Sequence, residues 1–382
     1  MNFHETKTLA ERLELMSKIS DPFLTRAEKI DLEGGFPFRN IEDLKNSGYT
    51  ALTVPKKYGG MEISIFELVC LQEKIAEKDG ATALSIGWHM GFIKNLSEYL
   101  TWEEDLFQKL CMEAKKGALV NAAATEPKTG SPTRGGKPQT TAEKQGKEWV
   151  IEGRKTFTTM SPILDYFIVS ATIKDTDQVG NFLIHRSCPG VSIEETWDSL
   201  GMRGTGSHDL VLRNVKIQEE CFVEAFKPGK KKPNASLLHI PSCYLGIAQA
   251  AQAYAIQFAK EYAPNSISGA IIDIATVQQR IGEMELELMK SRHFLYSVAK
   301  MWDSASKEER IKLQPELSAV KHAVTNSAIK VVDIAMRVVG AKSLSMQNPL
   351  QRYYRDVRAG LHNPPMDDMT IQTLASSAIQ KQ

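Results

Sequence analysis

The spacing of apolar residues divides the chain into three parts. Up to about residue 117, apolar residues recur three and four positions apart, which is typical of helices. They then gather in short runs separated by turn residues, such as EWVIEG, YFIVSATI, NFLIHR, VSIEETW and HDLVLRNVKI, which is typical of closely spaced strands. From residue 227 the helical spacing returns. We therefore predict an N-terminal α-helical domain (1–117), a middle β domain (118–226) and a C-terminal helical domain (227–382).

Several elements within these parts can be placed. Segments 41–49, 63–80 and 81–100 are expected to be helices, with the second ending at Gly80, because glycine commonly follows a helix. The middle runs favour a β-sandwich or barrel over alternating strands and helices. The last part carries two long apolar stripes, so we predict an antiparallel four-helix bundle. The stripes are Val277, Ile281, Met284, Leu288, Leu295, Val298 and Trp302, and Leu317, Val320, Val324, Val331, Ile334 and Val338.

Composition and charge exclude several classes of function. The 382 residues carry a net charge of +1, which gives no electrostatic basis for binding nucleic acid or a membrane surface. The five cysteines are scattered without a CxxC pair, so neither a disulfide framework nor a metal site is expected. The N-terminus lacks the apolar core of a signal peptide, and no apolar run reaches membrane-spanning length. We expect a cytoplasmic protein. The basic segment 227–234 is interpreted as a linker, with a phosphate-steering patch as the alternative.

Two stretches of the middle part are candidates for a binding site. NAAATEPKTGSP (121–132) and WVIEGRKTFTTMS (149–161) each begin with apolar or β-branched residues and end in small hydroxyl residues with Gly or Pro. Gly130 lets the backbone approach a ligand closely. The alternative is a pair of hydrophilic loops. The candidate hydroxyl donors are Thr125, Thr129, Ser131, Thr158 and Thr159.

Five motifs carry a resemblance to a known family. VPKKYGG, ATEPKTGS, EGRKTFTT, LGMRGTGSHDL and QNPLQRYYRDVR occur in this order over nearly the whole chain. With them the sequence resembles the acyl-CoA dehydrogenase superfamily. The resemblance implies a helical domain, a β domain and a helical bundle, a noncovalently bound FAD, and a homo-oligomer, either a dimer or a dimer of dimers.

The resemblance also implies roles for individual residues. The backbone around Ala124 and Thr125 is expected to face the pyrimidine edge of the flavin ring, and Ser131 to bond the FAD pyrophosphate or the substrate. Phe157 takes the place of an aromatic residue that covers the ring. Thr159 is expected to donate its hydroxyl to flavin N5, where reduction places negative charge.

The chain departs from the family at the catalytic base. In most of the family a glutamate removes the substrate α-proton, and the matching position here is Pro364. Some members carry it at the start of the first bundle helix, and there the match is about Ser236. The segments that contact the FAD of a second subunit also differ, reading APNSISGAI at 263–271 and Arg337-Val-Val-Gly340-Ala later. Arg337 and Gly340 remain candidate cofactor contacts, and FMN becomes an alternative cofactor.

The segment at the missing base resembles another branch of the fold. LHNPP is similar to the LHDP segment of the dibenzothiophene monooxygenase group, which uses reduced flavin from a separate reductase together with oxygen. His362 is then a candidate proton donor, or else part of a rigid turn that ends a helix. Asp367 and Asp368 are candidate replacement bases, or the cap and first turn of a helix. His89 could reach the same pocket or lie in the core.

Three functions follow from these residues. The first is α,β-dehydrogenation of an acyl-CoA thioester with hydride transfer to flavin N5, working with an electron-transfer partner. The second is a two-component flavin monooxygenase of the same fold, supplied by a flavin reductase. The third is a non-catalytic protein that binds flavin or acyl-CoA.

Overall fold

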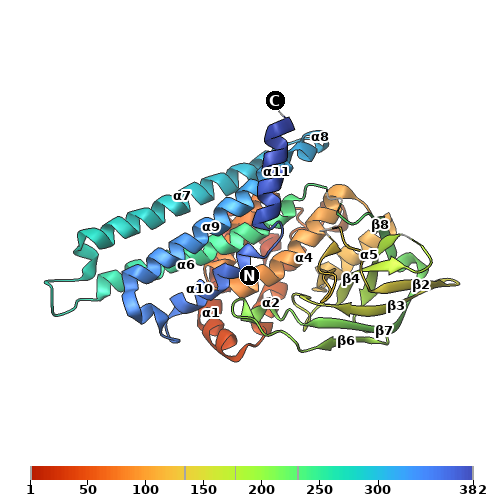
Figure 1. Cartoon of the computed structure of the whole chain (residues 1–382), viewed down its shortest axis with the longest axis horizontal. Coiled ribbons are helices and arrows are strands. Elements are labelled where there is room, and N and C mark those ends of the chain that lie inside the picture. Colours follow the sequence, from red (N-terminus) through yellow and green to blue (C-terminus); the bar gives the residue numbers. More distant parts are fainter. Residues whose placement is uncertain (1, 133–134, 177, 230–231, 381–382) are drawn as a thin grey trace.

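A computed structural model describes residues 2–132, 135–176, 178–229 and 232–380, and it has the three predicted parts in the predicted order (Figure 1). The first helix begins where the sequence provides a capping box. Thr8 Oγ1 accepts a hydrogen bond from the Glu11 amide (3.2 Å), and the Glu11 carboxylate accepts one from the Thr8 amide (3.1 Å). The helices of this part are α1 (Leu9–Glu33), α2 (Phe38–Asn46), α3 (Ile65–Ala76), α4 (Gly80–Tyr99) and α5 (Glu104–Lys115).

Gly80 begins a helix instead of ending one. Helix α3 stops at Ala76, and Asp79 caps α4 by accepting hydrogen bonds from the amides of Ala81 (3.2 Å) and Thr82 (3.3 Å). A Cβ at Gly80 would stand 2.5 Å from Ile247 Cδ1, so glycine is present for close packing. The predicted helix end at Gly80 was therefore wrong.

The middle part is the predicted β domain, built as one hydrogen-bonded sheet. Its strand order is β6-β7-β3-β2-β4-β5-β8, and β1 pairs in parallel with β4 beside β2. Strand β4 is buried along almost its whole length because it lies in the middle of this order. The strands are β1 (Val120–Ala123), β2 (Thr141–Gln145), β3 (Glu148–Lys155), β4 (Tyr166–Ile173), β5 (Val179–His185), β6 (Val191–Glu194), β7 (Asp209–Gln218) and β8 (Phe222–Phe226).

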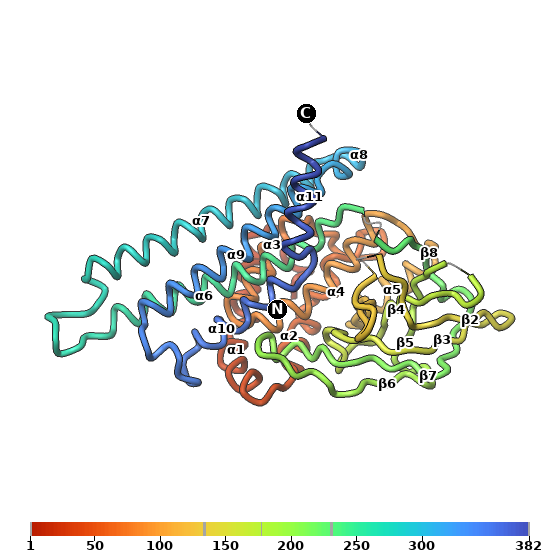
Figure 2. The backbone as a smooth tube through the Cα atoms, viewed as in Figure 1, coloured from red at the N-terminus to blue at the C-terminus, as the bar shows by residue number. Residues whose placement is uncertain are grey.

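The C-terminal part is the predicted helical bundle. Helix α7 runs antiparallel to α6 and α9, which lie side by side in the same direction, and α10 packs across α6 and α9 (Figures 1 and 2). The two predicted stripes face inward, with Ile281 alone left half-buried. The helices are α6 (His239–Glu261), α7 (Ala275–Ser304), α8 (Lys307–Arg310), α9 (Gln314–Val339), α10 (Pro349–Arg358) and α11 (Asp367–Gln380). The expected linker 227–234 joins the sheet to this bundle, and its residues 230–231 lie outside the described residues.

One continuous apolar core joins the three parts. It includes Leu71 of α3, Phe167 of β4 and Val324 of α9, and a smaller cluster lies under α5. The carboxylate of Asp303, near the end of α7, accepts hydrogen bonds from the amides of Ile65 and Phe66 (both 2.9 Å) and so caps α3. Among the described residues, no helix is long and apolar enough to cross a membrane.

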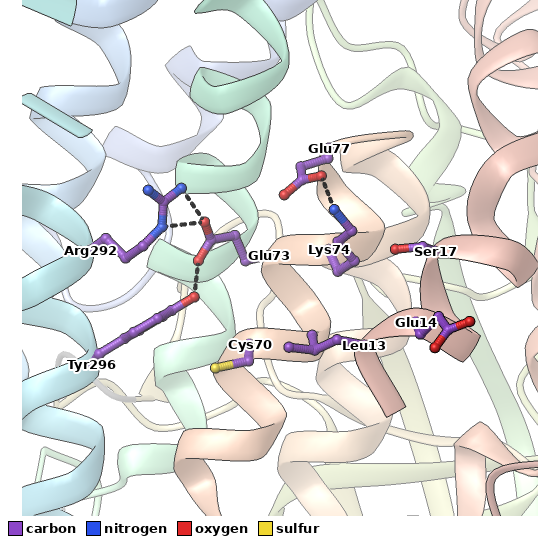
Figure 3. A pocket seen from close by; sticks show the side chains of 9 residues that line it. All are labelled: Leu13, Glu14, Ser17, Cys70, Glu73, Lys74, Glu77, Arg292 and Tyr296. Atoms are coloured by element: carbon purple, nitrogen blue, oxygen red, sulfur yellow. Dashed lines mark hydrogen bonds and ion pairs between the residues drawn. The ribbon is translucent and has the colours of Figure 1, made fainter. Parts of the chain in front are cut away.

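A hollow of about 400 Å³ opens between α1, α3 and α7 (Figure 3). Glu73 accepts hydrogen bonds there from Arg292 Nε (2.9 Å) and Nη2 (2.7 Å) and from the Tyr296 hydroxyl (2.7 Å). Lys74 pairs with Glu77 at 2.7 Å. Because these charges are already paired with one another, the hollow offers a ligand little beyond shape, and the site described below lies elsewhere.

Candidate active site

The two stretches singled out in the sequence lie side by side. The Thr156 amide donates to the Thr125 carbonyl oxygen (2.9 Å), and Asn121 Nδ2 donates to the Thr159 carbonyl oxygen (3.1 Å). The first stretch leaves the end of β1 and the second leaves the end of β3. Together they form one surface, which we call the wall (residues 121–131 and 156–159).

A buried ion pair fixes the wall from behind. Glu126 Oε1 accepts from Lys155 Nζ (2.7 Å) and from the amide (2.9 Å) and hydroxyl (2.7 Å) of Thr140. Its Oε2 accepts from the Thr129 hydroxyl and the Gln139 amide, both at 2.6 Å. Burial raises the pKa of Glu126, but the bonds from Lys155 and the hydroxyl groups outweigh it and hold the pKa at about 2. Burial lowers the pKa of Lys155 to about 8.

The sequence pattern alone did not identify Glu126 or Lys155 as residues of the site. Both stand inside the quoted motifs, ATEPKTGS and EGRKTFTT, so a signal was present. A charge in a hydroxyl-rich loop is usually solvated, and only the structure shows these two buried together, with exposed fractions of 3% and 0%.

The exposed side of the wall presents an aromatic ring and hydroxyl groups. Phe157 is 61% exposed and has a φ of +55°, a left-handed conformation that is rare for a bulky residue. Its ring meets that of Trp197 edge-on at 5.8 Å. Thr159 Oγ1 lies 3.0 Å from Ser207 Oγ. Thr158 is buried, and its hydroxyl has no hydrogen-bonding partner among the described residues.

These groups fit a flavin ring. Ala124 and Thr125 are half-buried, and the Thr125 carbonyl oxygen is already bonded to the Thr156 amide. A flat, mainly apolar ring system with hydrogen-bonding edges needs an aromatic or apolar face together with short donors at its rim. The exposed ring of Phe157 is such an aromatic face, and the hydroxyl of Thr159 is such a short donor. Ser131, also half-buried, lies at the end of the wall.

A chain of contacts joins the wall to the C-terminal part. Trp197 Nε1 donates to the carbonyl oxygens of Arg203 (3.1 Å) and Met202 (3.3 Å). The Met202 amide in turn donates to Asp356 Oδ1 of α10 (2.5 Å). Asp356 is buried, and burial raises its pKa to about 7 against the opposing effect of the Met202 bond. The Arg-Asp-Val-Arg motif thus supports the residue against which Phe157 rests.

The segment at the missing glutamate is a turn between α10 and α11. His362 is exposed, and Asn363 is held by a hydrogen bond from the Tyr244 hydroxyl. Asp367 and Asp368 form the first turn of α11. Asp367 accepts a hydrogen bond from Asn326 Nδ2 (3.0 Å) and lies 3.1 Å from His322 Nδ1.

The contacts of Asp367 determine its strength as a base. Burial raises the pKa of Asp367, but the bonds from Asn326 and His322 outweigh it, so the pKa is lowered overall. A carboxylate held in this way is a weaker proton acceptor than a free one.

His89 lies away from this turn and is fully engaged. Its Nε2 donates to the Thr50 carbonyl oxygen (3.0 Å), and its Nδ1 accepts from the Val120 amide (3.2 Å). Burial lowers its pKa to about 4, so the imidazole is neutral. The structure therefore gives His89 a role in joining α4 to β1.

Arg337 and Gly340 are exposed at the C-terminal end of α9. The Arg337 carbonyl oxygen accepts from Arg280 (3.0 Å). His322 of the same helix contacts Asp367, and Arg337 lies about 22 Å further along α9, at 1.5 Å per residue. Gly340 follows the end of the helix and lies further still. Within one chain the structure does not bring them to that segment.

No metal centre is present in the described part of the chain: it has no group of three or more His, Cys, Asp or Glu side chains placed to hold an ion. Its cysteines are unpaired, with Cys70, Cys111 and Cys243 buried and the other two half-buried.

The three-part architecture with a wall of this composition defines a flavoprotein fold of the acyl-CoA dehydrogenase type. Family models for the N-terminal, middle and C-terminal domains of acyl-CoA dehydrogenase match residues 14–104, 121–215 and 238–363. The chain is 54% identical over 369 residues to "Putative acyl-CoA dehydrogenase YdbM" of Bacillus subtilis (strain 168), covering 96% of each chain. It belongs to the acyl-CoA dehydrogenase family. The domain boundaries 117/118 and 226/227 remain predictions.

More distant relatives differ in their chemistry. A 3-(aryl)acrylate reductase of Clostridium sporogenes (strain ATCC 15579) is 26% identical over 91% of this chain and 93% of its own. Butyryl-CoA dehydrogenase from Megasphaera elsdenii has the same fold, with a TM-score of 0.88 at 19% identity over 99% of this chain and 100% of that one. FMN-bound TdsC from Paenibacillus sp. A11-2 has a TM-score of 0.85 at 21% identity over 97% of both chains. Family membership therefore leaves the reaction open.

Proposed function

We propose that this protein is a flavin-dependent oxidoreductase that oxidises a small molecule with reduced flavin and oxygen, as a two-component monooxygenase. The proposal rests on which residues occupy the positions of the family's catalytic base. The two positions where the family carries its glutamate hold Pro364 and Ser236, and Asp367 is tied to Asn326 and His322. Dehydrogenation needs a free carboxylate to take the α-proton, whereas reaction of reduced flavin with oxygen does not.

The wall would hold the ring of FMN or FAD. When bound, a flavin supplies two-electron chemistry with either a hydride donor or oxygen. Phe157 would cover the ring and exclude water, and the hydroxyl of Thr159, which lies 3.0 Å from Ser207 Oγ, would donate toward the ring. The backbone of Ala124 and Thr125 would offer further contacts at the rim, whereas the hydroxyl of Thr158, which we predicted as a cofactor contact, is buried and does not reach the surface of the wall.

His362 is proposed as the proton carrier of this site. An imidazole accepts and releases a proton near neutral pH, and this side chain is exposed on the turn that replaces the glutamate. Asn363, next to it, is anchored by Tyr244, so the turn has a fixed support. We propose a flavin reductase as the partner that delivers reduced cofactor, and the cytoplasm as the location.

The cofactor test is the visible spectrum of the protein after separate incubation with FMN and FAD, followed by gel filtration. The reaction test is stopped-flow mixing of the anaerobically reduced holoprotein with oxygen. We expect the bound flavin to reoxidise more slowly than free reduced flavin, and His362→Ala to remove that delay. Reoxidation at the rate of free flavin would contradict the monooxygenase proposal, and a protein that retains no flavin would favour a non-catalytic binding role.

A second candidate is dehydrogenation of an acyl-CoA thioester with transfer of electrons to an electron-transferring flavoprotein. The 54% identity to YdbM, whose name carries that activity, favours it. Asp367 or Asp368 would then have to serve as the base. Anaerobic titration of the oxidised holoprotein with a panel of acyl-CoA thioesters separates the two candidates, because only a dehydrogenase loses its flavin absorbance without oxygen. The homo-oligomeric state, with Arg337 and Gly340 turned toward a second subunit, is also part of this proposal.

A further inference from the structure

A second opening in the molecule lies between α5 and the sheet. It is a cavity of about 450 Å³, bounded by α5, the start of β4, the end of β5 and the end of β7. Its volume lies within the range of about 300–1,000 Å³ that is usual for small-molecule sites. The lining includes four aliphatic side chains, Leu106, Leu110, Leu183 and Ile217, and two thiols, Cys188 and Cys221.

The cavity separates two apolar clusters. Leu183 of β5 belongs to the smaller cluster under α5, whereas Ile217 of β7 belongs to the main core. Side chains at the margin of each cluster line the cavity and remain half-buried. Apolar surface left open in this way favours an apolar ligand, because binding removes that surface from water. The half-buried side chains are Leu106 and Tyr166 beside the smaller cluster, and Cys188 and Cys221 beside the main core.

The charged groups of the cavity favour an anion. Lys109 of α5 and Lys216 of β7 line the opening, and neither forms an ion pair with the rest of the described chain. Within that part of the chain, Glu220 supplies the one carboxylate of the lining, so two ammonium groups face one negative charge. The hollow between α1, α3 and α7 differs in this respect, because Arg292 and Lys74 are each paired with a glutamate there.

The cavity and the wall lie toward different ends of the strands. Gln218, which lines the cavity, pairs with Glu148 at the start of β3, whereas the wall continues from the end of β3. The two ends of β3 are about 23 Å apart, at about 3.3 Å per residue. Tyr166 likewise pairs with Val120 at the start of β1, whose other end leads into the wall. The cavity is therefore a separate place from the candidate active site.

We propose that this cavity binds a small amphiphile with one acid group, an aliphatic monocarboxylate of medium chain length. Its carboxylate binds at Lys109 and Lys216, and its apolar chain fills the space between the two clusters. The carboxylate gives both ammonium groups a partner, and burial of the chain covers the half-open apolar side chains. The inference concerns a site outside the candidate active site and goes beyond the proposed function.

The probes are octanoate and octan-1-ol, which have the same chain and differ in the charge of the head group. Binding of each to the purified full-length protein is measured by isothermal titration calorimetry, at concentrations below those at which octanoate forms micelles. We expect wild-type protein to bind octanoate about tenfold more tightly than octan-1-ol, the difference that two exposed charge contacts make.

Two double variants test the role of the lysines. Lys109→Gln with Lys216→Gln removes both ammonium groups and keeps the apolar lining, so it should bind the two probes equally. Because both side chains are exposed, we expect Tm to stay unchanged. Lys307→Gln with Lys312→Gln removes two exposed lysines that do not line the cavity. This matched control should keep the preference for octanoate.

The two thiols report where the probe binds. Burial, followed by the neighbouring Glu220 and Cys188, raises the pKa of the Cys221 thiol, so alkylation by N-ethylmaleimide is followed at pH 8. Mass spectrometry of peptides gives the rate for each cysteine. At ten times its dissociation constant, octanoate should slow alkylation of Cys188 and Cys221 about tenfold. Cys243 of α6, which is fully buried elsewhere, is the internal control and should not change.

Several results would overturn the inference. These are equal binding of the two probes to wild-type protein, a preference for octanoate that survives loss of both cavity lysines, and absence of binding by either probe. Equal slowing of all three cysteines would also overturn it, because the probe would then stabilise the protein from another site. None of these measurements uses flavin or oxygen, so a protein without the proposed function would still give a clear result here.

Discussion

Single residues decide how rigid the wall is. Glu126 is a carboxylate with five short hydrogen bonds, four from the loop between β1 and β2 and one from Lys155 of β3, and it stays ionised while almost fully buried. A charge in such a place stabilises only while its partner remains, since removal of one member leaves the other charge unpaired. The pair with Lys155 therefore ties the geometry of both halves of the wall to one contact.

Replacement of Glu126 by glutamine should lower the free energy of unfolding by about 3 kcal/mol, because Lys155 is left without its carboxylate. Urea unfolding at pH 7 measures the loss. Glu143→Gln is the matched control, since it breaks the exposed 2.6 Å pair with Lys174 and should cost measurably less. Equal losses of unfolding free energy in the two variants would mean that the buried pair stabilises the protein no more than the exposed pair does.

Acid should remove the same stabilisation in wild-type protein. The pKa of Glu126 falls from 4.5 to about 2 on folding, so its contribution is complete above about pH 4.5 and is lost as the pH falls toward 2. Glu126→Gln should lack this part of the acid sensitivity. Urea unfolding repeated between pH 5 and pH 2 checks the expectation, and parallel curves for the two proteins would contradict it.

Phe157 should matter to the ligand and not to the fold. Because the ring is 61% exposed, Phe157→Ala should leave the Tm of the flavin-free protein unchanged while weakening flavin binding about tenfold, as loss of an aromatic contact does. Fluorescence titration with FMN and FAD measures the affinity. Phe38→Ala removes a ring that is 52% exposed outside the wall and should leave flavin affinity unchanged.

At the level of elements, helix α10 supports a loop that belongs to the sheet. Asp356 holds the Met202 amide, and Met202 and Arg203 hold Trp197, against which Phe157 rests. Arg355 adds a second support, because it pairs with Asp31 of α1 and donates to the Leu200 carbonyl oxygen (2.8 Å). Two helices from opposite ends of the chain thus fix one loop.

Ionisation of Asp356 should make the stability of the protein fall as the pH rises, which is the opposite of the effect of Glu126. Its pKa rises from 3.8 to about 7 on folding, mainly through burial, so its contribution to stability is present below about pH 4 and is lost as the pH rises to about 7. Asp356→Asn should remove this decline and keep the bond from Met202. Denaturant unfolding between pH 4 and pH 8 tests it. Asp367→Asn, at a carboxyl group whose pKa is lowered, should not flatten the same window.

The individual helices were the features of the fold that could be predicted best from the sequence. The stripes from Val277 to Trp302 and from Leu317 to Val338 repeat with the helical period, so the helices that carry them could be predicted. The end of α3 could not, because Asp79 caps the following helix and moves Gly80 from a stop to a start. The sequence there carries both a helix-stop signal, Gly80, and a helix-start signal, Asp79. In the structure Asp79 caps α4, so Gly80 belongs to the following helix.

The candidate site was harder to predict from the sequence because its residues are far apart in the chain. The stretches that form the wall could be chosen from their small hydroxyl residues, and motif resemblance supplied a ligand. The contact between Met202 and Asp356 spans 154 positions, and the pairing of Glu126 with Lys155 depends on burial that composition does not reveal.

At the scale of the whole molecule, the three parts share one core. Apolar residues of α3, β4 and α9 belong to a single packed cluster, and α7 caps α3 through Asp303. Domains joined in this way lose stability together, because opening one exposes the apolar surface of the others.

We therefore expect one cooperative unfolding transition. Hydrogen exchange followed by mass spectrometry should give the same opening free energy for peptides from β4 and from α9. Peptides from α11, which projects from the bundle and has Ile371 and Ile379 exposed, should exchange earlier and serve as the internal control (Figure 1). Separate opening free energies for the sheet and the bundle would show that they unfold as independent units.

The bonds between α4 and β1 limit how this architecture can be recombined. His89 spans the Thr50 carbonyl and the Val120 amide, and the Leu119 amide donates to Asp165 Oδ2 (2.8 Å). A gene divided after residue 117, or a chimera that takes its first 117 residues from a relative, separates His89 from the Val120 amide, whereas the bond to Thr50 stays within the first part and the bond between Leu119 and Asp165 stays within the second. Exchange of parts among homologues, in the laboratory or in evolution, must therefore keep a histidine at position 89 that can accept from the backbone amide of residue 120.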